Sequence, residues 1–184
     1  MGLTLIKALT ASSSASLDFV DGTSDVVMDS TYNEYQFQFV NMHPATNNVD
    51  FSFQVNATDG ADYNDSAITS THFAAYHSED DATTNLHYDD EVDLAQSTSY
   101  QVLARYFGNA NDESGSGVLT LYAPSSTTFV KHFTTRVVLN ANSGYQHDRN
   151  VAGYINDTTA IDEISFKFSS GNIDEGTIYM YGVS

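Results

Sequence analysis

The chain has 184 residues and carries 24 acidic side chains against 6 Lys and Arg, so its formal net charge is −18. It has no cysteine, which excludes disulfides, thiol catalysis and cysteine-ligated zinc or iron–sulfur sites. A charge this negative argues against binding nucleic acid through its phosphates, which requires clustered Lys and Arg. With 41% hydrophobic residues, 12 Tyr and 11 Phe, the chain is also too apolar for an acidic disordered tail.

The start of the chain, MGLTLIKALTASSSAS, combines apolar and small residues. Lys7 interrupts the apolar run and no basic stretch precedes it, so no cleaved signal peptide is expected. No stretch reaches the roughly 18 uninterrupted apolar residues of a membrane span. We therefore expect a protein made in a cytoplasm, without a membrane partner.

Alternation of apolar and polar residues predicts strands along most of the chain, because successive side chains of a strand point to opposite faces. The pattern is strictest where Tyr35, Phe37 and Phe39 alternate with glutamines. In chain order, the predicted strands are 3–9, 15–20, 35–39, 49–55, 71–76, 99–106, 118–122, 129–139, 151–155, 164–168 and 177–183.

Segments dense in Asn, Asp, Gly and Ser separate these strands and predict turns. Nine to eleven short strands joined by such turns indicate an all-β chain, folded as a single jelly-roll-like β-sandwich domain over residues 1–184. Residues 1–20 are expected to form an N-terminal docking strand or arm. The best helix candidate, 89–96, is short and acidic.

The last predicted strand is apolar on both faces, which indicates either burial on both sides or contact with a partner subunit. Aromatic residues in strands are more often core than interface. The five residues of this strand that we take as interface candidates are Ile178, Tyr179, Met180, Tyr181 and Val183.

Histidine-based metal binding has weak support. His72, His77 and His87 lie near the acidic run 79–93, but His72 and His77 are five residues apart and point to opposite faces of a regular strand. No HExxH spacing occurs, so a solvated acidic loop with incidental histidines is the favoured interpretation.

The oxygen-rich turn Asp59–Asp65 is the best calcium candidate. It departs from the EF-hand template because Ala61 occupies a ligand position and the required glycine is missing. Carboxylates and amides are also ordinary turn formers. The sequence therefore predicts neither a metal site nor a cofactor.

No catalytic motif stands out. GxSxG, GxxxxGK[ST] and GxGxxG are all missing. A glycosidase needs two carboxylates, but 24 acids offer so many pairs that no particular pair is informative. The sequence therefore predicts no catalytic residue.

The charge is uneven along the chain. Residues 1–104 hold 16 acids and a single base, Lys7, whereas residues 105–184 hold 8 acids and 5 bases. This split predicts an acidic first half that faces solvent and a more balanced second half that docks on a partner.

Three stretches together resemble a known group of proteins. They are YNEYQFQFVNMHPAT at 32–46, VDFSFQV at 49–55 and FKFSSGNIDEGTIYMYG at 166–182. With the opening LIKALTASSSASLDF at 5–19, they are similar to small virion structural proteins of marine tailed bacteriophages, such as those infecting cyanobacteria and Pelagibacter-like hosts.

The resemblance implies a non-enzymatic protein of the virion, assembled in the host cytoplasm. A capsid decoration (cement) protein is the first expectation: a symmetric homo-oligomer, with a trimer favoured, bound to the major capsid protein or to tail proteins. Decoration predicts a broad subunit interface and no deep cleft.

Two alternatives remain open. A tail or tail-fibre component that binds a host-surface glycan predicts an aromatic-lined shallow site. A jelly-roll glycoside-active enzyme predicts two carboxylates about 5 to 9 Å apart in a concave site.

Overall fold

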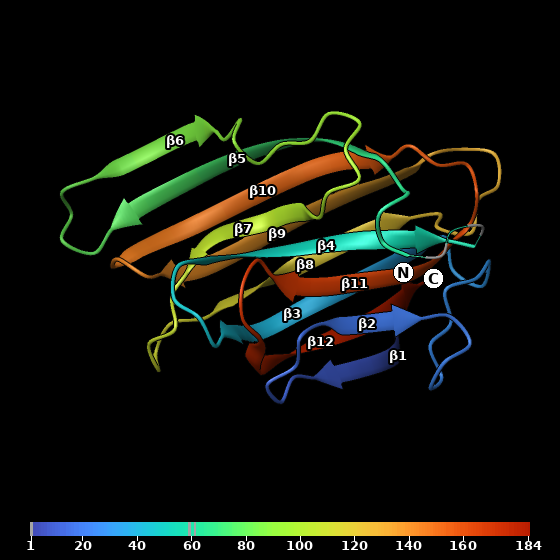
Figure 1. Cartoon of the computed structure of the whole chain (residues 1–184), viewed down its shortest axis with the longest axis horizontal. Coiled ribbons are helices and arrows are strands. Elements are labelled where there is room, and N and C mark those ends of the chain that lie inside the picture. Colours follow the sequence, from blue (N-terminus) through green and yellow to red (C-terminus); the bar gives the residue numbers. More distant parts are fainter. Residues whose placement is uncertain (1, 59, 61) are drawn as a thin grey trace.

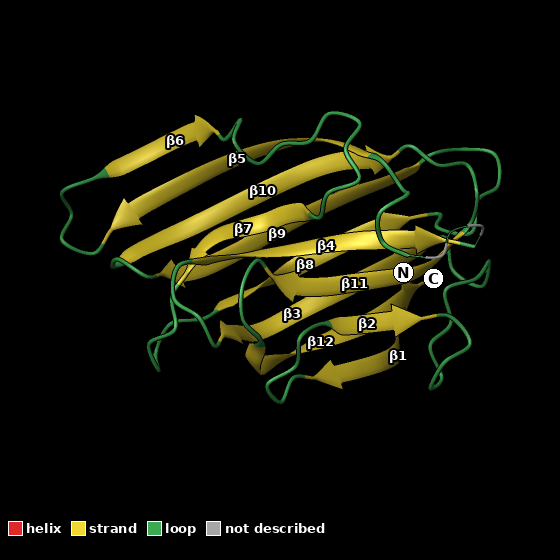
Figure 2. Cartoon of the chain, in the orientation of Figure 1, coloured by secondary structure: helices red, strands yellow, loops and turns green. Residues whose placement is uncertain are grey.

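The computed structural model describes residues 2–58, 60 and 62–184, and all regular structure in them is β-strand, as Figure 2 shows. This confirms the predicted all-β class. All strand pairs are antiparallel. The strands are β1 (Leu3–Thr10), β2 (Leu17–Val20), β3 (Glu34–Pro44), β4 (Val49–Ala57), β5 (Ile68–Ser78), β6 (Thr84–Tyr88), β7 (Gln101–Phe107), β8 (Gly115–Tyr122), β9 (Lys131–Ala141), β10 (Tyr145–Ile155), β11 (Ile161–Phe168) and β12 (Ile173–Val183).

Eight of the strands have the order of a jelly roll. One layer runs β1-β12-β3-β8, and the layer packed against it runs β2-β11-β4-β7. Strands from the two ends of the chain therefore alternate within both layers. This interleaving corrects the expectation drawn from the charge split, because the first and second halves of the chain do not form separate halves of the molecule.

Two inserted hairpins enlarge the first layer. The β9–β10 hairpin follows β8, the β5–β6 hairpin follows β4, and the two hairpins pair through β10 and β5 (Figure 1). The result is a long sheet, β1-β12-β3-β8-β9-β10-β5-β6, and a short sheet, β2-β11-β4-β7. We call β10, β5 and β6 the sheet extension. The two sheets meet at one corner, where Phe107 of β7 pairs with Ala141 of β9.

The core lies between the sheets and is built largely from phenylalanine. Phe166 of β11 is fully buried, and its ring centroid lies 5.2 Å from that of Phe39 and 5.5 Å from that of Phe37. Near the corner, a Cβ on Gly115 would lie 2.4 Å from the Phe107 ring, so only glycine lets β8 pass there. The alternation that predicted these strands thus places the apolar rows in one shared core.

The structure differs from the sequence expectations at the sheet extension. Strand β6 was not predicted, and β10 begins six residues before the predicted 151–155. Residues 89–96 form no helix, and backbone hydrogen bonds hold this segment along the edge of β5. The N–H of Asp89 donates to the carbonyl of His72, and the N–H of Ser70 donates to the carbonyl of Leu94. Tertiary pairing overrides weak local patterns here.

The two outer faces of the sandwich are covered to different degrees. On the short sheet, the side chain of Gln54 is fully buried beneath the segments that contain Ser66, Thr98 and Ser99, and its amide donates to their backbone carbonyls. On the long sheet, no loop of the described residues buries the outer side chains in this way, and Phe73 and Arg136 are exposed. One paired row of this outer face contains Tyr179, Gln38, Val118, Arg136, Asn150 and Phe73.

Strand β12 lies between β1 and β3, which separates the five interface candidates. Ile178 and Met180 are fully buried in the core and have no surface to offer a partner. Tyr179 and Tyr181 lie on the outer face with their rings stacked at 6.4 Å, and Val183 is half-buried. The N-terminal segment forms β1 at the edge of the long sheet and β2 at the edge of the short sheet.

Candidate functional site

The inner face of the long sheet changes chemistry where the short sheet ends. A row of cross-strand neighbours, one residue from each strand, runs from Phe39 through Val137 to Arg149 and on to His87. The jelly-roll part of this row packs in the core, whereas β10, β5 and β6 extend past β7, the last strand of the short sheet (Figure 1). Polar and aromatic side chains of the sheet extension therefore face a space that the second layer does not fill.

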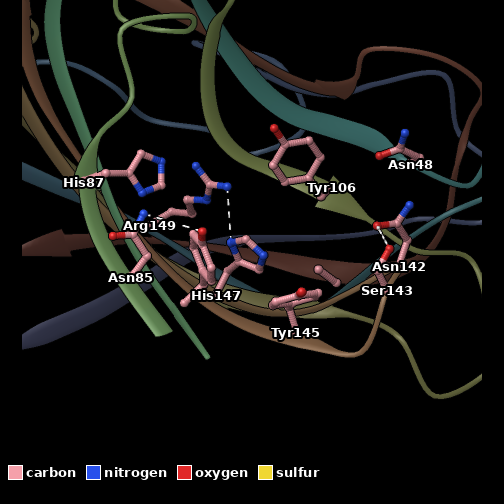
Figure 3. A pocket seen from close by; sticks show the side chains of 11 residues that line it. Asn48, Asn85, His87, Tyr106, Asn142, Ser143, Tyr145, His147 and Arg149 are labelled. Atoms are coloured by element: carbon pink, nitrogen blue, oxygen red, sulfur yellow. Dashed lines mark hydrogen bonds between the residues drawn. The ribbon is translucent and has the colours of Figure 1, made fainter. Parts of the chain in front are cut away.

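A pocket of about 490 Å³ occupies this space (Figure 3). Its lining combines aromatic rings, side-chain amides and a single guanidinium, and it contains no carboxylate although the chain has 24. The lining residues are Asn48, Tyr76, Asn85, His87, Tyr106, Ala141, Asn142, Ser143, Tyr145, His147 and Arg149.

The floor of the pocket is a cluster of rings from three adjacent strands. The Tyr76 ring centroid of β5 lies 5.3 Å from that of His147 and 5.7 Å from that of Tyr145, both on β10. His87 of β6 lies 5.8 Å from Tyr76 on its other side. Because neighbouring strands fix their spacing, these rings form a preorganised aromatic surface.

Tyr106 closes the pocket from the short sheet, and its backbone is in an unusual conformation. Its φ of +68° lies in the left-handed region, which is costly for a tyrosine. The guanidinium carbons of Arg105 and Arg149 lie 4.7 Å and 5.4 Å from its ring centroid. Its backbone carbonyl accepts a hydrogen bond from the backbone N–H of Asn142 at 3.1 Å. These contacts hold the strained residue where its ring lines the pocket.

A buried ion pair supports the floor from beneath. Arg149 is 1% exposed and its Nη1 donates to Asp89 Oδ2 at 2.6 Å. Asp89 Oδ1 accepts from Arg105 at 3.2 Å, and the same Arg105 nitrogen donates to Glu91 at 2.7 Å. Burial alone would raise the pKa of Asp89, but the hydrogen bond from Arg149 and the charges of Arg105 and Arg149 lower it below its usual range.

Two histidines beside Arg149 remain neutral because they are desolvated. Burial, followed by the positive charge of Arg149, lowers the pKa of His72 and of His147 to about 4. Arg149 Nη2 lies 3.2 Å from His147 Nδ1, which indicates that this nitrogen accepts. Because Nδ1 of the neutral His147 ring accepts from Arg149, its Nε2–H is the group left to donate at the pocket wall.

The histidines singled out in the sequence do not come together as a metal site. His72 is buried on the inner face, His87 lies in the pocket, and His77 points away with 52% of its side chain exposed. The described residues contain no group of three or more side chains that could hold a metal ion. In the calcium candidate turn, Asp59 and Ala61 lie outside the described residues.

Sequence reasoning missed the pocket. Its floor is contributed by Tyr145, His147 and Arg149, which occupy alternate positions in YQHDR. This period of two places all three on one face of a strand, a signal that was available but lacked the apolar character by which strands were identified. The partners from β5, β6 and β7 are distant in sequence and no pattern joins them.

Asp89 and Glu91 both bind Arg105, but the buried ion pair predicts that removing Asp89 destabilises the fold far more than removing Glu91. Asp89→Ala leaves Arg149 buried without its counter-ion and is expected to lower the free energy of unfolding by about 3–5 kcal/mol. Glu91→Ala removes a 70% exposed partner of Arg105 and is expected to cost less than about 1 kcal/mol. Urea unfolding of both variants measures the difference, and equal losses would contradict this account of the site.

The lowered pKa values of His72 and His147 predict that the free energy of unfolding falls as the pH is lowered from 6.5 to about 4. In this window the unfolded chain protonates both imidazoles and the folded chain does not. Each pH unit therefore lowers the free energy of unfolding by up to about 1.4 kcal/mol per histidine, and the effect ends below the folded-state pKa because both states then carry the proton. Urea unfolding at about pH 7 and pH 5 measures it.

The variant His72→Leu is expected to lose less stability between these two pH values than the unmodified chain. Phe73→Leu, at the exposed residue next to His72 on β5, changes no titratable group; it is the control and is expected to keep the original pH dependence. The same pH dependence in all three proteins would refute the assignment to His72.

No helix in the described part of the chain is long and apolar enough to cross a membrane. Comparison of the chain with protein-family models, with curated proteins and with solved structures finds no match.

Proposed function

We propose that this chain is a non-enzymatic saccharide-binding protein of a virion, a tail or tail-fibre component that recognises a host-surface glycan. The observation that carries the proposal is the pocket on the sheet extension, with its aromatic floor, its amide-bearing rim and its lack of carboxylates. The virion setting rests on the resemblance of the sequence and stands as part of the proposal.

The chemistry of the pocket matches that of a sugar ring. A pyranose has C–H faces that pack on the negative face of an aromatic ring, and Tyr76, Tyr145 and His147 supply such a surface. Its hydroxyls need donors and acceptors around the rim, which Asn48, Asn85 and Asn142 provide in side-chain amides. An aromatic floor with a few polar groups that fix orientation is typical of a small-molecule site.

The lining also distinguishes between ligand classes. A cation is disfavoured because no carboxylate faces the pocket and Arg149 lies at its base. The charge of Arg149 is already compensated by Asp89, so a neutral ligand fits better than a strongly anionic one. The carboxylate pair of a glycoside-active enzyme is missing from this lining, which supports binding over hydrolysis.

Glycan-array screening with the intact chain, followed by calorimetric titration of the best oligosaccharide, tests the proposal. Tyr145→Ala and Tyr76→Ala are each expected to weaken binding by about tenfold or more, since each removes part of the stacking surface. Asn142→Ala is expected to weaken binding while the fold stays intact by circular dichroism.

Phe129→Ala is the control, because Phe129 is 72% exposed in the loop before β9 and does not line the pocket. It is expected to bind as the unmodified chain does. Absence of binding to every glycan tested, or binding that survives both tyrosine substitutions, would overturn the proposal.

A capsid decoration role is the second candidate. It is favoured by the uncovered outer face of the long sheet, a surface broad enough to be buried in a symmetric oligomer. Copy number in purified particles distinguishes the two: hundreds of copies per particle indicate decoration, whereas a few dozen or fewer indicate a tail or fibre component.

A further inference from the structure

The outer face of the long sheet, which we call the open face, is the broadest regular surface of the molecule. It consists of the outward-pointing side chains of β1, β12, β3, β8, β9, β10, β5 and β6. Large apolar side chains on it are partly exposed, including Val138 at 40%, Phe73 at 46% and Leu86 at 71%. The equivalent face of the short sheet is covered by the chain itself, as Gln54 shows.

The open face carries only a small part of the net charge of the molecule. Across its paired rows, from β12 to β6, the charged residues are Glu34, Glu175, Arg136 and Asp148. Arg136 and Asp148 neutralise each other in a two-pronged ion pair at 2.8 and 2.9 Å, so Glu34 and Glu175 leave a net charge of about −2. The chain as a whole carries −18, so most of its negative charge lies on other surfaces.

The size of the open face suits a stable interface. Eight strands spaced about 4.8 Å apart give a width of about 38 Å, and strands of about ten residues are about 30 Å long, so the face covers roughly 1,000 Å². A standard protein–protein interface buries about 800 Å² on each partner.

We propose that the open face binds a second copy of this chain, with the two long sheets packed face to face about a two-fold axis. Two molecules of charge −18 repel each other in most orientations. With the open faces together, surfaces of low net charge meet and most of the acidic side chains of the two copies stay apart. A face that is the same on both copies generates a two-fold axis, and two aligned sheets pack well at about 10 Å.

The arrangement leaves the pocket free. Side chains of β10, β5 and β6 alternate between the pocket and the open face, so Tyr145 and His147 face inward while Asp148 faces outward. The dimer therefore carries two pockets on its two distal sides. The proposal does not depend on what the pocket binds.

Sedimentation velocity of the intact chain over a wide concentration range, at low and high salt, tests the dimer. We expect a species of twice 20.1 kDa whose population rises with protein concentration and with salt, because salt screens the residual repulsion. Val138→Glu adds a negative charge near the centre of the face and is expected to weaken dimerisation at least tenfold. Phe129→Glu adds the same charge in a loop off the face and is expected to leave it unchanged.

The lack of cysteine permits a second readout that is independent of folding effects. A spin label on Val138→Cys is expected to report a short distance between the two copies, and a label on Phe129→Cys a longer one. A monomer at every concentration, a trimer, equal weakening by the two glutamate variants, or a longer distance at position 138 than at 129 would each overturn the proposal.

Discussion

The sheet extension depends on one buried interaction, the ion pair between Arg149 and Asp89. Both side chains are nearly removed from water, which is unfavourable for either charge alone and is offset only when both are present and further hydrogen-bonded. Asp89 belongs to the segment that follows β6, so the pair fixes that segment along β5. Through Arg105 and the ring of Tyr106 it also ties the sheet extension to the end of the short sheet.

The two inserted hairpins explain why this jelly roll has a pocket. Without β9, β10, β5 and β6, the layers would be four strands each and would cover one another. The hairpins widen only one layer, so its inner face continues beyond the core. Where the core has phenylalanines, this continuation has Tyr76, His147 and Arg149. Pairing in a continuous sheet holds these side chains in register, which gives the site rigidity that a loop would lack.

Much of the fold was accessible from the sequence because its strands obey a simple rule. Tyr35, Phe37 and Phe39, or Phe166 and Phe168, alternate with polar residues, and a core-facing row of this kind specifies both the strand and its inward face. The same rule fails at two places. The inward-facing residues of β6 are Asn85 and His87, and those at the start of β10 are Tyr145, His147 and Arg149. Polar residues that face a pocket resemble a solvated loop when only hydropathy is considered.

The sequence by itself determined the all-β class, most of the strands, the absence of cysteine chemistry and the strongly acidic character of this protein. Only the tertiary structure decided which strands are neighbours, that Ile178 and Met180 are core while Tyr179 and Tyr181 face outward, and that few of the acidic side chains lie on the outer face of the long sheet. The physical reason is that alternation along a strand is local, whereas sheet order joins residues from opposite ends of the chain. A pocket whose walls come from β5, β6, β7 and β10 exists only after that pairing has formed.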